Sequence, residues 1–144
     1  MKQILILLFI TLFFASVLYS QKINENKIPD TVKSSFYSKF PNAENVKWGK
    51  ESKSVYEAEF KLSDTDMSAN FSVEGEWLET ETEIQITSLP QAVIDAVNRD
   101  YNDAKITGAS KIVRPDNKII YEADIKYNHH KKEVLYDDQG NETK

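Results

Sequence analysis

The sequence predicts an α+β fold, a tandem repeat of a helix packed on an antiparallel β-sheet, with the two sheets joined into one curved sheet. Two observations lead to this prediction. The chain repeats itself, because residues 28–32 match residues 89–93 and the stretch YEAEFK at 56–61 matches YEADIK at 121–126. In each copy the spacing of the apolar side chains also changes from four residues to two, as it does where a helix is followed by strands.

Each copy begins with a helix and continues as strands. Apolar side chains recur at every fourth position over 28–40 and 89–101, and Pro29 and Pro90 lie in the first turn, where a missing N–H costs nothing. Strands with one buried face are expected at 45–48, 55–62, 67–73 and 77–86, and in the second copy at 106–113, 119–127 and 132–137. The offset between the copies is 61 residues at the helices and 65 at the YEA strands, so the second copy has four additional residues, which we place around 114–117. We expect the last strand of the second copy to be absent or only a few residues long. Each unit alone would have a thin core, so we expect the two sheets to pair into one.

The first twenty residues have the pattern of a secretory signal peptide. Lys2 is followed by an apolar run over 4–18 and then by small or polar residues. The run is short for a bilayer span, which favours cleavage between Ser20 and Gln21 over an uncleaved membrane anchor. The chain has no cysteine, which excludes a lipoprotein anchor, disulfides and thiolate metal sites. We therefore expect a periplasmic or secreted protein with no stable membrane insertion, organised as a signal peptide (1–20), a linker (21–27), a first repeat (28–86) and a second repeat (87–144).

The composition and motifs argue against several classes of function. The formal net charge of −5 repels phosphate backbones, so nucleic acid is not an expected partner. The sequence has no nucleophile-elbow serine and no glycine-rich phosphate loop, and the histidine pair at 129–130 is expected at a solvated turn. Residues 137–142 resemble a calcium loop but lack its ligand spacing, which favours a hairpin turn. The sequence thus predicts no catalytic residue, no defined metal site and no cofactor.

One face of the first sheet is a candidate binding surface. If Tyr56, Ala58 and Phe60 face the helix, acidic and aromatic side chains lie on the opposite face. The candidate binding residues are Trp48, Glu57, Glu59, Asn70, Trp77, Glu79, Glu81 and Glu83. Aromatic anchors carry much of the energy of protein interfaces, which favours a protein partner. Two alternatives stay open: Trp48 completes the core while the glutamates only keep the surface solvated, or the glutamates bind a divalent cation weakly.

The paired helix starts at Ile28-Pro29 and Leu89-Pro90, the YEAEF and YEADI strands and the hairpin glycines Gly75 and Gly140 resemble those of the PepSY-like family. The family is also described as beta-lactamase-inhibitor-like (BLIP-like), and its members are mainly exported proteins of Bacteroidetes. The resemblance implies a tandem helix-and-sheet fold, no known catalytic residues, and binding or inhibition of another protein. We expect an exported, non-enzymatic binding module that inhibits or chaperones an envelope or secreted protein. The alternative is a periplasmic protein that binds a small ligand or a divalent cation.

Overall fold

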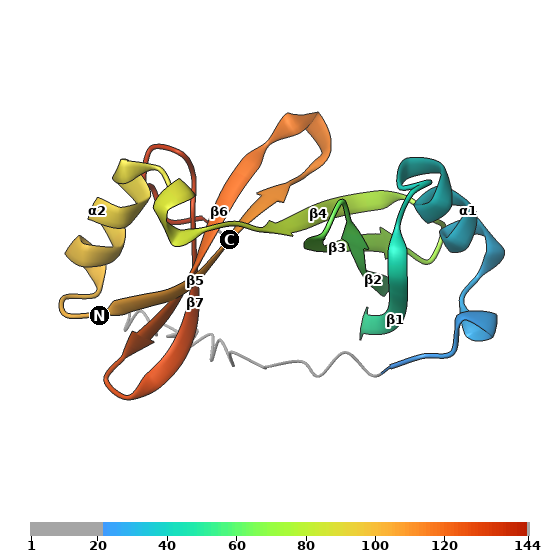
Figure 1. Cartoon of the computed structure of the whole chain (residues 1–144), viewed down its shortest axis with the longest axis horizontal. Coiled ribbons are helices and arrows are strands. Elements are labelled where there is room, and N and C mark those ends of the chain that lie inside the picture. Colours follow the sequence, from blue (N-terminus) through green and yellow to red (C-terminus); the bar gives the residue numbers. More distant parts are fainter. Residues whose placement is uncertain (1–21, 144) are drawn as a thin grey trace, which may run out of the picture.

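The computed structural model describes residues 22–143, so the predicted signal peptide lies outside the described residues. Two helices, α1 (Asp30–Lys39) and α2 (Gln91–Asp100), accompany one antiparallel sheet, and they lie at opposite ends of the molecule (Figure 1). The sheet has seven strands in chain order: β1 (Glu44–Ser52), β2 (Val55–Leu62), β3 (Thr65–Ser72), β4 (Trp77–Glu83), β5 (Lys105–Val113), β6 (Ile119–Tyr127) and β7 (His130–Tyr136). Among these residues, no helix has the length and apolar character needed to cross a membrane.

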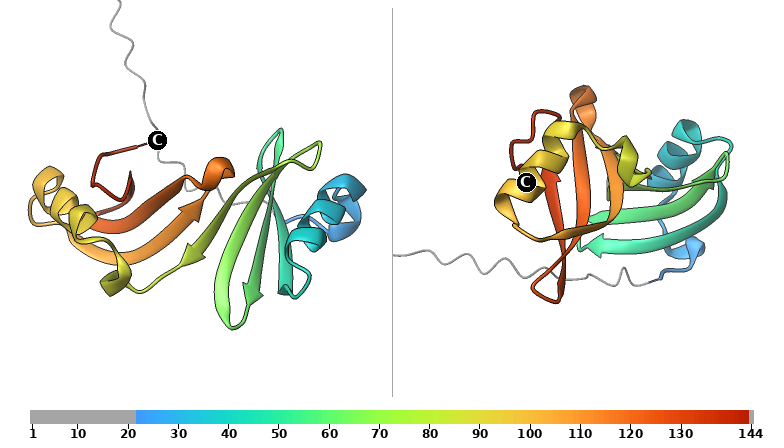
Figure 2. Two further views of the ribbon diagram at one scale, coloured as in Figure 1. Left: turned by 90° about the horizontal axis from the view of Figure 1, so that it is seen from above. Right: turned by 60° about the vertical axis from the view of Figure 1, so that its left-hand side comes forward.

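The predicted fold class is confirmed. We call α1 with β1–β4 the first repeat and α2 with β5–β7 the second repeat, and Figure 2 shows the one sheet that runs through both. The strand expected at 45–48 is longer, because its polar continuation still pairs through the backbone as far as Ser52↔Val55. The strand expected at 77–86 ends earlier, at Glu83, before the short 3-10 turn η2 (Ile86–Ser88).

Each helix covers its own part of the sheet with a separate core. In the first repeat, the Phe36 ring lies 5.1 Å from the rings of Trp48 and Phe60 and 6.1 Å from that of Phe71, measured between centroids. The core of the second repeat is mainly aliphatic: Leu89, Val93, Ala96, Val97, Ala109, Ala123, Ile125, Val134 and Tyr136. Both cores lie on the same face of the sheet.

The strand register explains why the two helices share a face. Ala69 belongs to the first core and pairs with Thr80, which pairs with Val113 across the junction of the repeats. Side chains two residues apart on a strand share a face, so Ala109 lies on the same side as Val113 and belongs to the second core. The opposite face of the sheet therefore has no helix over it in the described chain. We call it the inner face.

A glycine in each repeat allows its hairpin to contact the first turn of its helix. Gly75 and Gly140 have φ angles of +88° and +77°, a region that favours glycine. A Cβ atom on Gly75 would lie 2.8 Å from the carbonyl oxygen of Thr31, and one on Gly140 would overlap that of Ala92. Thr31 and Ala92 occupy equivalent places in the two helices, so the contact is part of the repeated unit.

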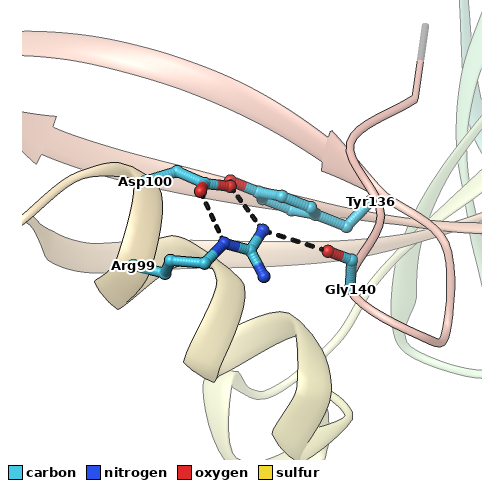
Figure 3. Close-up of polar contacts among 4 residues, drawn as sticks. All are labelled: Arg99, Asp100, Tyr136 and Gly140. Atoms are coloured by element: carbon cyan, nitrogen blue, oxygen red, sulfur yellow. Dashed lines mark hydrogen bonds and ion pairs between the residues drawn. The ribbon is translucent and has the colours of Figure 1, made fainter.

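The end of α2 is also fixed to the turn that contains Gly140 (Figure 3). Arg99 donates to the Asp100 carboxylate at 2.7 and 2.8 Å and to the Gly140 carbonyl oxygen at 3.4 Å. The hydroxyl of the fully buried Tyr136 donates to Asp100 at 3.1 Å. This network satisfies the polar end of a core residue and has a structural role.

We predict that Gly140→Ala lowers the free energy of unfolding by at least about 2 kcal/mol, because the methyl group adds a clash to an unfavourable positive φ. Urea denaturation of the purified protein measures this loss. Asp138→Ala, an exposed substitution in the same turn, is the control and should change stability by less than about 0.5 kcal/mol. Equal stability of the two variants would contradict the proposed contact.

Candidate functional site

The inner face carries a groove of about 580 Å³ that extends from the first repeat into the second. Its lining residues come from all seven strands: Asn45, Lys47, Glu59, Phe60, Lys61, Asp66, Met67, Ser68, Glu81, Glu83, Gly108, Ala109, Ser110, Glu122, Asp124 and Glu133. The groove thus depends on the pairing of both repeats in one sheet.

The strand register brings carboxylates of the two repeats together. In the first repeat, Glu59 and Glu81 both pair with Ser68 and so share the inner face. At the junction, Ser110 pairs with both Glu83 and Glu122. Asp124 follows Glu122 on the same face of β6 and pairs with Glu133 of β7.

Four of these side chains form the acidic cluster: Glu81, Glu122, Asp124 and Glu133. One carboxylate oxygen from each of Glu122, Asp124 and Glu133 lies within 4.8 Å of the others. A hard cation would find oxygen ligands there. The cluster borders an apolar floor, because Ile112 and Ile120 also lie on the inner face and are 4% and 0% exposed.

This environment disfavours the ionised form of two glutamates. Burial, reinforced by the negative charges of Glu81 and Glu133, raises the pKa of Glu122 to about 8. Burial also raises the pKa of Glu81, although a hydrogen bond from Ser110 acts in the opposite direction. The cluster therefore holds a proton at neutral pH and favours any group that brings positive charge.

Glu79 is neutralised by the chain itself. Arg114, which follows β5, donates to Glu79 at 2.8 Å, and both side chains are about three-quarters buried, with 28% and 25% exposed. Asn70 donates to the second carboxylate oxygen at 3.2 Å. This contact joins the two repeats on the inner face.

The other glutamates expected on this face also lie there. Glu57 pairs with Asn70, which pairs with Glu79, and the same alternation places Glu59, Glu81 and Glu83 on the inner face. The candidate binding residues predicted from the sequence therefore lie together on the inner face, except for the two tryptophans.

The expected position of Trp77 is wrong. A register shift between β3 and β4 pairs Asn70 with Glu79 but Phe71 with Trp77, so one additional residue, Leu78, interrupts the alternation. Trp77 consequently packs against the first core on the helix side. The ammonium group of Lys39 lies 3.6 Å from the centroid of its ring.

The placement of Trp48 on the candidate binding surface is also wrong. Its side chain is 3% exposed, and its ring contacts Phe36 edge-to-face. The alternative that Trp48 completes the core is the one the structure supports. Neither tryptophan lies on the inner face.

Sequence reasoning missed the half of the groove that comes from the second repeat. The repeat itself contains the signal, because an offset of 65 aligns Glu57 with Glu122, Glu59 with Asp124, and Ser68 with Glu133. Applying the same face assignment to the second copy would have identified these residues. Only the joining of the sheets could show that they meet Glu81.

We predict that Glu122→Gln stabilises the protein in alkaline solution and has little effect in acid. The pKa of folded Glu122 is raised above its ordinary 4.5, so its favourable contribution is complete below that pH and is lost as the pH rises through about 8. Denaturation at about pH 9 should show a gain of about 1–2 kcal/mol, discounted for partial solvent screening. The exposed substitution Glu74→Gln is the control, and a gain that does not depend on pH would contradict the assignment.

Comparisons with known proteins agree with this architecture. A family model described as "Putative beta-lactamase-inhibitor-like, PepSY-like" matches residues 18–68 and 54–144. No curated protein matches the chain.

Several solved structures have the same fold. A protein from Bacteroides eggerthii, described as one of the "putative periplasmic proteins", is 21% identical. It has a TM-score of 0.69, and the match covers 81% of this chain and 86% of that protein. A DUF2874 family protein from Bacteroides uniformis has 20% identity and a TM-score of 0.69 over the same shares. A BLIP-like protein from Bacteroides fragilis has 21% identity and a TM-score of 0.64 over 81% of this chain and 83% of its own.

At these identities the solved structures establish the fold alone, whereas the family model matches both repeats. The two matches of the family model agree with the internal repeat of the sequence and with the presence of one helix on each half of the sheet. The chain belongs to the PepSY-like, beta-lactamase-inhibitor-like family.

Proposed function

We propose that this protein is an exported, non-enzymatic binding module whose groove holds a basic segment of another exported or envelope protein. The observation that carries the proposal is the charge imbalance of the groove. Seven acidic and two basic side chains line it, and one of the two, Lys61, is already paired with Asp66 at 2.8 Å. A partner that brings lysine or arginine would complete this surface electrostatically.

The free energy for binding comes from relieving repulsion in a partly desolvated site. In the free protein, Glu122 is protonated near neutral pH, which removes its repulsion with the charges of Glu81 and Glu133. A basic side chain beside Glu122 would lower its pKa and release that proton. Binding should therefore depend on pH, and protons should be released as the partner binds.

The family's description as inhibitor-like supports binding over catalysis. The acidic cluster has no histidine among its members, and the only two histidines of the chain lie at the hairpin between β6 and β7. Export is supported by the apolar N-terminal segment and by the periplasmic description of a protein with the same fold. Inhibition and chaperoning are two consequences that such binding can have.

We predict that an oligolysine peptide binds the mature protein near pH 7 and that added salt weakens the complex. Replacing Glu81 and Glu122 together by glutamine should weaken binding by about tenfold or more, since the complex loses the charge of Glu81 and the charge that Glu122 acquires when it releases its proton. Glu74→Gln, outside the groove, should bind as the unmodified protein does. Calorimetry in two buffers of different ionisation enthalpy measures affinity and proton release together.

The same calorimetric experiment tests the alternative function. If calcium chloride binds and the peptide does not, the groove is a cation site and the proposal is wrong. Equal peptide binding by the Glu81/Glu122 double variant would also contradict it.

A further inference from the structure

Strand β7 is paired along only one edge for most of its length. It pairs with β6 at seven positions, from Tyr121↔Tyr136 to Tyr127↔His130. On its other edge, residues 22–143 supply only the Tyr136↔Glu142 bridge and the hydrogen bond from the Thr143 amide to the Leu135 carbonyl at 2.9 Å. Within the described chain, the edge from His130 to Val134 has no strand beside it.

The first repeat shows how a strand fits on the equivalent edge. The bridge Tyr136↔Glu142 corresponds to the pair Phe71↔Trp77, because both residues are shifted by 65 positions. From Trp77 the chain continues as β4 along β3, with the pairs Asn70↔Glu79, Ala69↔Thr80, Ser68↔Glu81 and Met67↔Thr82. The corresponding positions of β7 are Leu135, Val134, Glu133 and Lys132.

We propose that an extended segment of the partner protein pairs with β7 along Lys132–Val134, as β4 pairs with β3, and directs lysine or arginine side chains into the groove. This inference rests on the proposed function and specifies its partner. Backbone hydrogen bonds would supply affinity, and alternate side chains would supply specificity.

The register of β3 and β4 defines the chemistry of the incoming segment. A residue opposite Glu133 would face the inner side, next to Asp124 and Glu122, where a basic side chain meets the acidic cluster. A residue opposite Val134 would face the helix side, beside the second core, where an apolar side chain is favoured. Basic and apolar residues should therefore alternate in the segment.

The charges on β7 disfavour pairing with a second copy of this protein. Lys131 and Lys132 are adjacent and exposed on this edge. Two antiparallel β7 edges would bring four lysines close together, an arrangement that protects edge strands from self-association. Lys132 pairs with Ile125 of the second core and so lies on the helix side of β7, where its ammonium group donates to the Tyr101 hydroxyl and lies 4.3 Å from the centroid of that ring.

The test uses the full mature chain and two synthetic peptides of alternating lysine and valine, one unmodified and one N-methylated on alternate backbone amides. We expect the unmodified peptide to bind about tenfold or more tightly than the N-methylated one, because methylation removes donors to β7. When the unmodified peptide binds, hydrogen exchange should slow by a similar factor at the backbone amides of β7 and should not change at those of β1. Glu133→Lys should weaken binding, whereas Asp138→Lys, a matched charge reversal in the exposed turn, should not.

Each other outcome overturns the strand pairing. If both peptides bind equally and the Glu81/Glu122 double variant binds neither, the groove binds basic groups without adding a strand, and only this inference fails. If neither peptide binds, the proposed function fails as well. A β7-mediated dimer in sedimentation would identify a second copy as the occupant and contradict a heterologous partner.

Discussion

The short pairing between β4 and β5 is the constraint on which the site depends. Only four residue pairs, from Thr80↔Val113 to Glu83↔Ser110, join the two repeats in the described sheet. A slip of one residue would exchange the two faces of β5 and place α2 on the other side from α1. The observed register instead puts both helices on one face and the polar residues of both repeats on the other.

The repeats contribute similar chemistry to the inner face but differ at its boundary. Glu57 and Glu59 of β2 have carboxylate equivalents in β6, so the joined sheet carries negative charge from both repeats on its inner face. The insertion of the second repeat begins at Arg114, which pairs with Glu79 of the first. Arg114 therefore neutralises Glu79 on the inner face, whereas the acidic cluster retains its excess of negative charge.

The fold was predictable because helix and strand periodicities are local properties repeated along the chain. The limits of β2 and β6 agree with the predicted ranges 55–62 and 119–127. The position of Trp77 was not predictable by alternation alone, because the register shift between β3 and β4 moves it to the helix side. Trp48 lies on that side because it pairs with Ala58 of the first core, a pairing between strands that the sequence alone does not specify. The meeting of Glu81 with Glu122 depends on the junction register, which no local pattern specifies.

The most direct test of this account is the pKa of Glu122, measured by nuclear magnetic resonance on its side-chain carboxyl carbon. We expect a pKa of about 8 that falls when Glu81 is replaced by glutamine, because the charge of the first repeat acts on a carboxyl group of the second. An ordinary pKa near 4.5, or one that does not respond to Glu81→Gln, would show that the two repeats do not share one partly buried acidic groove.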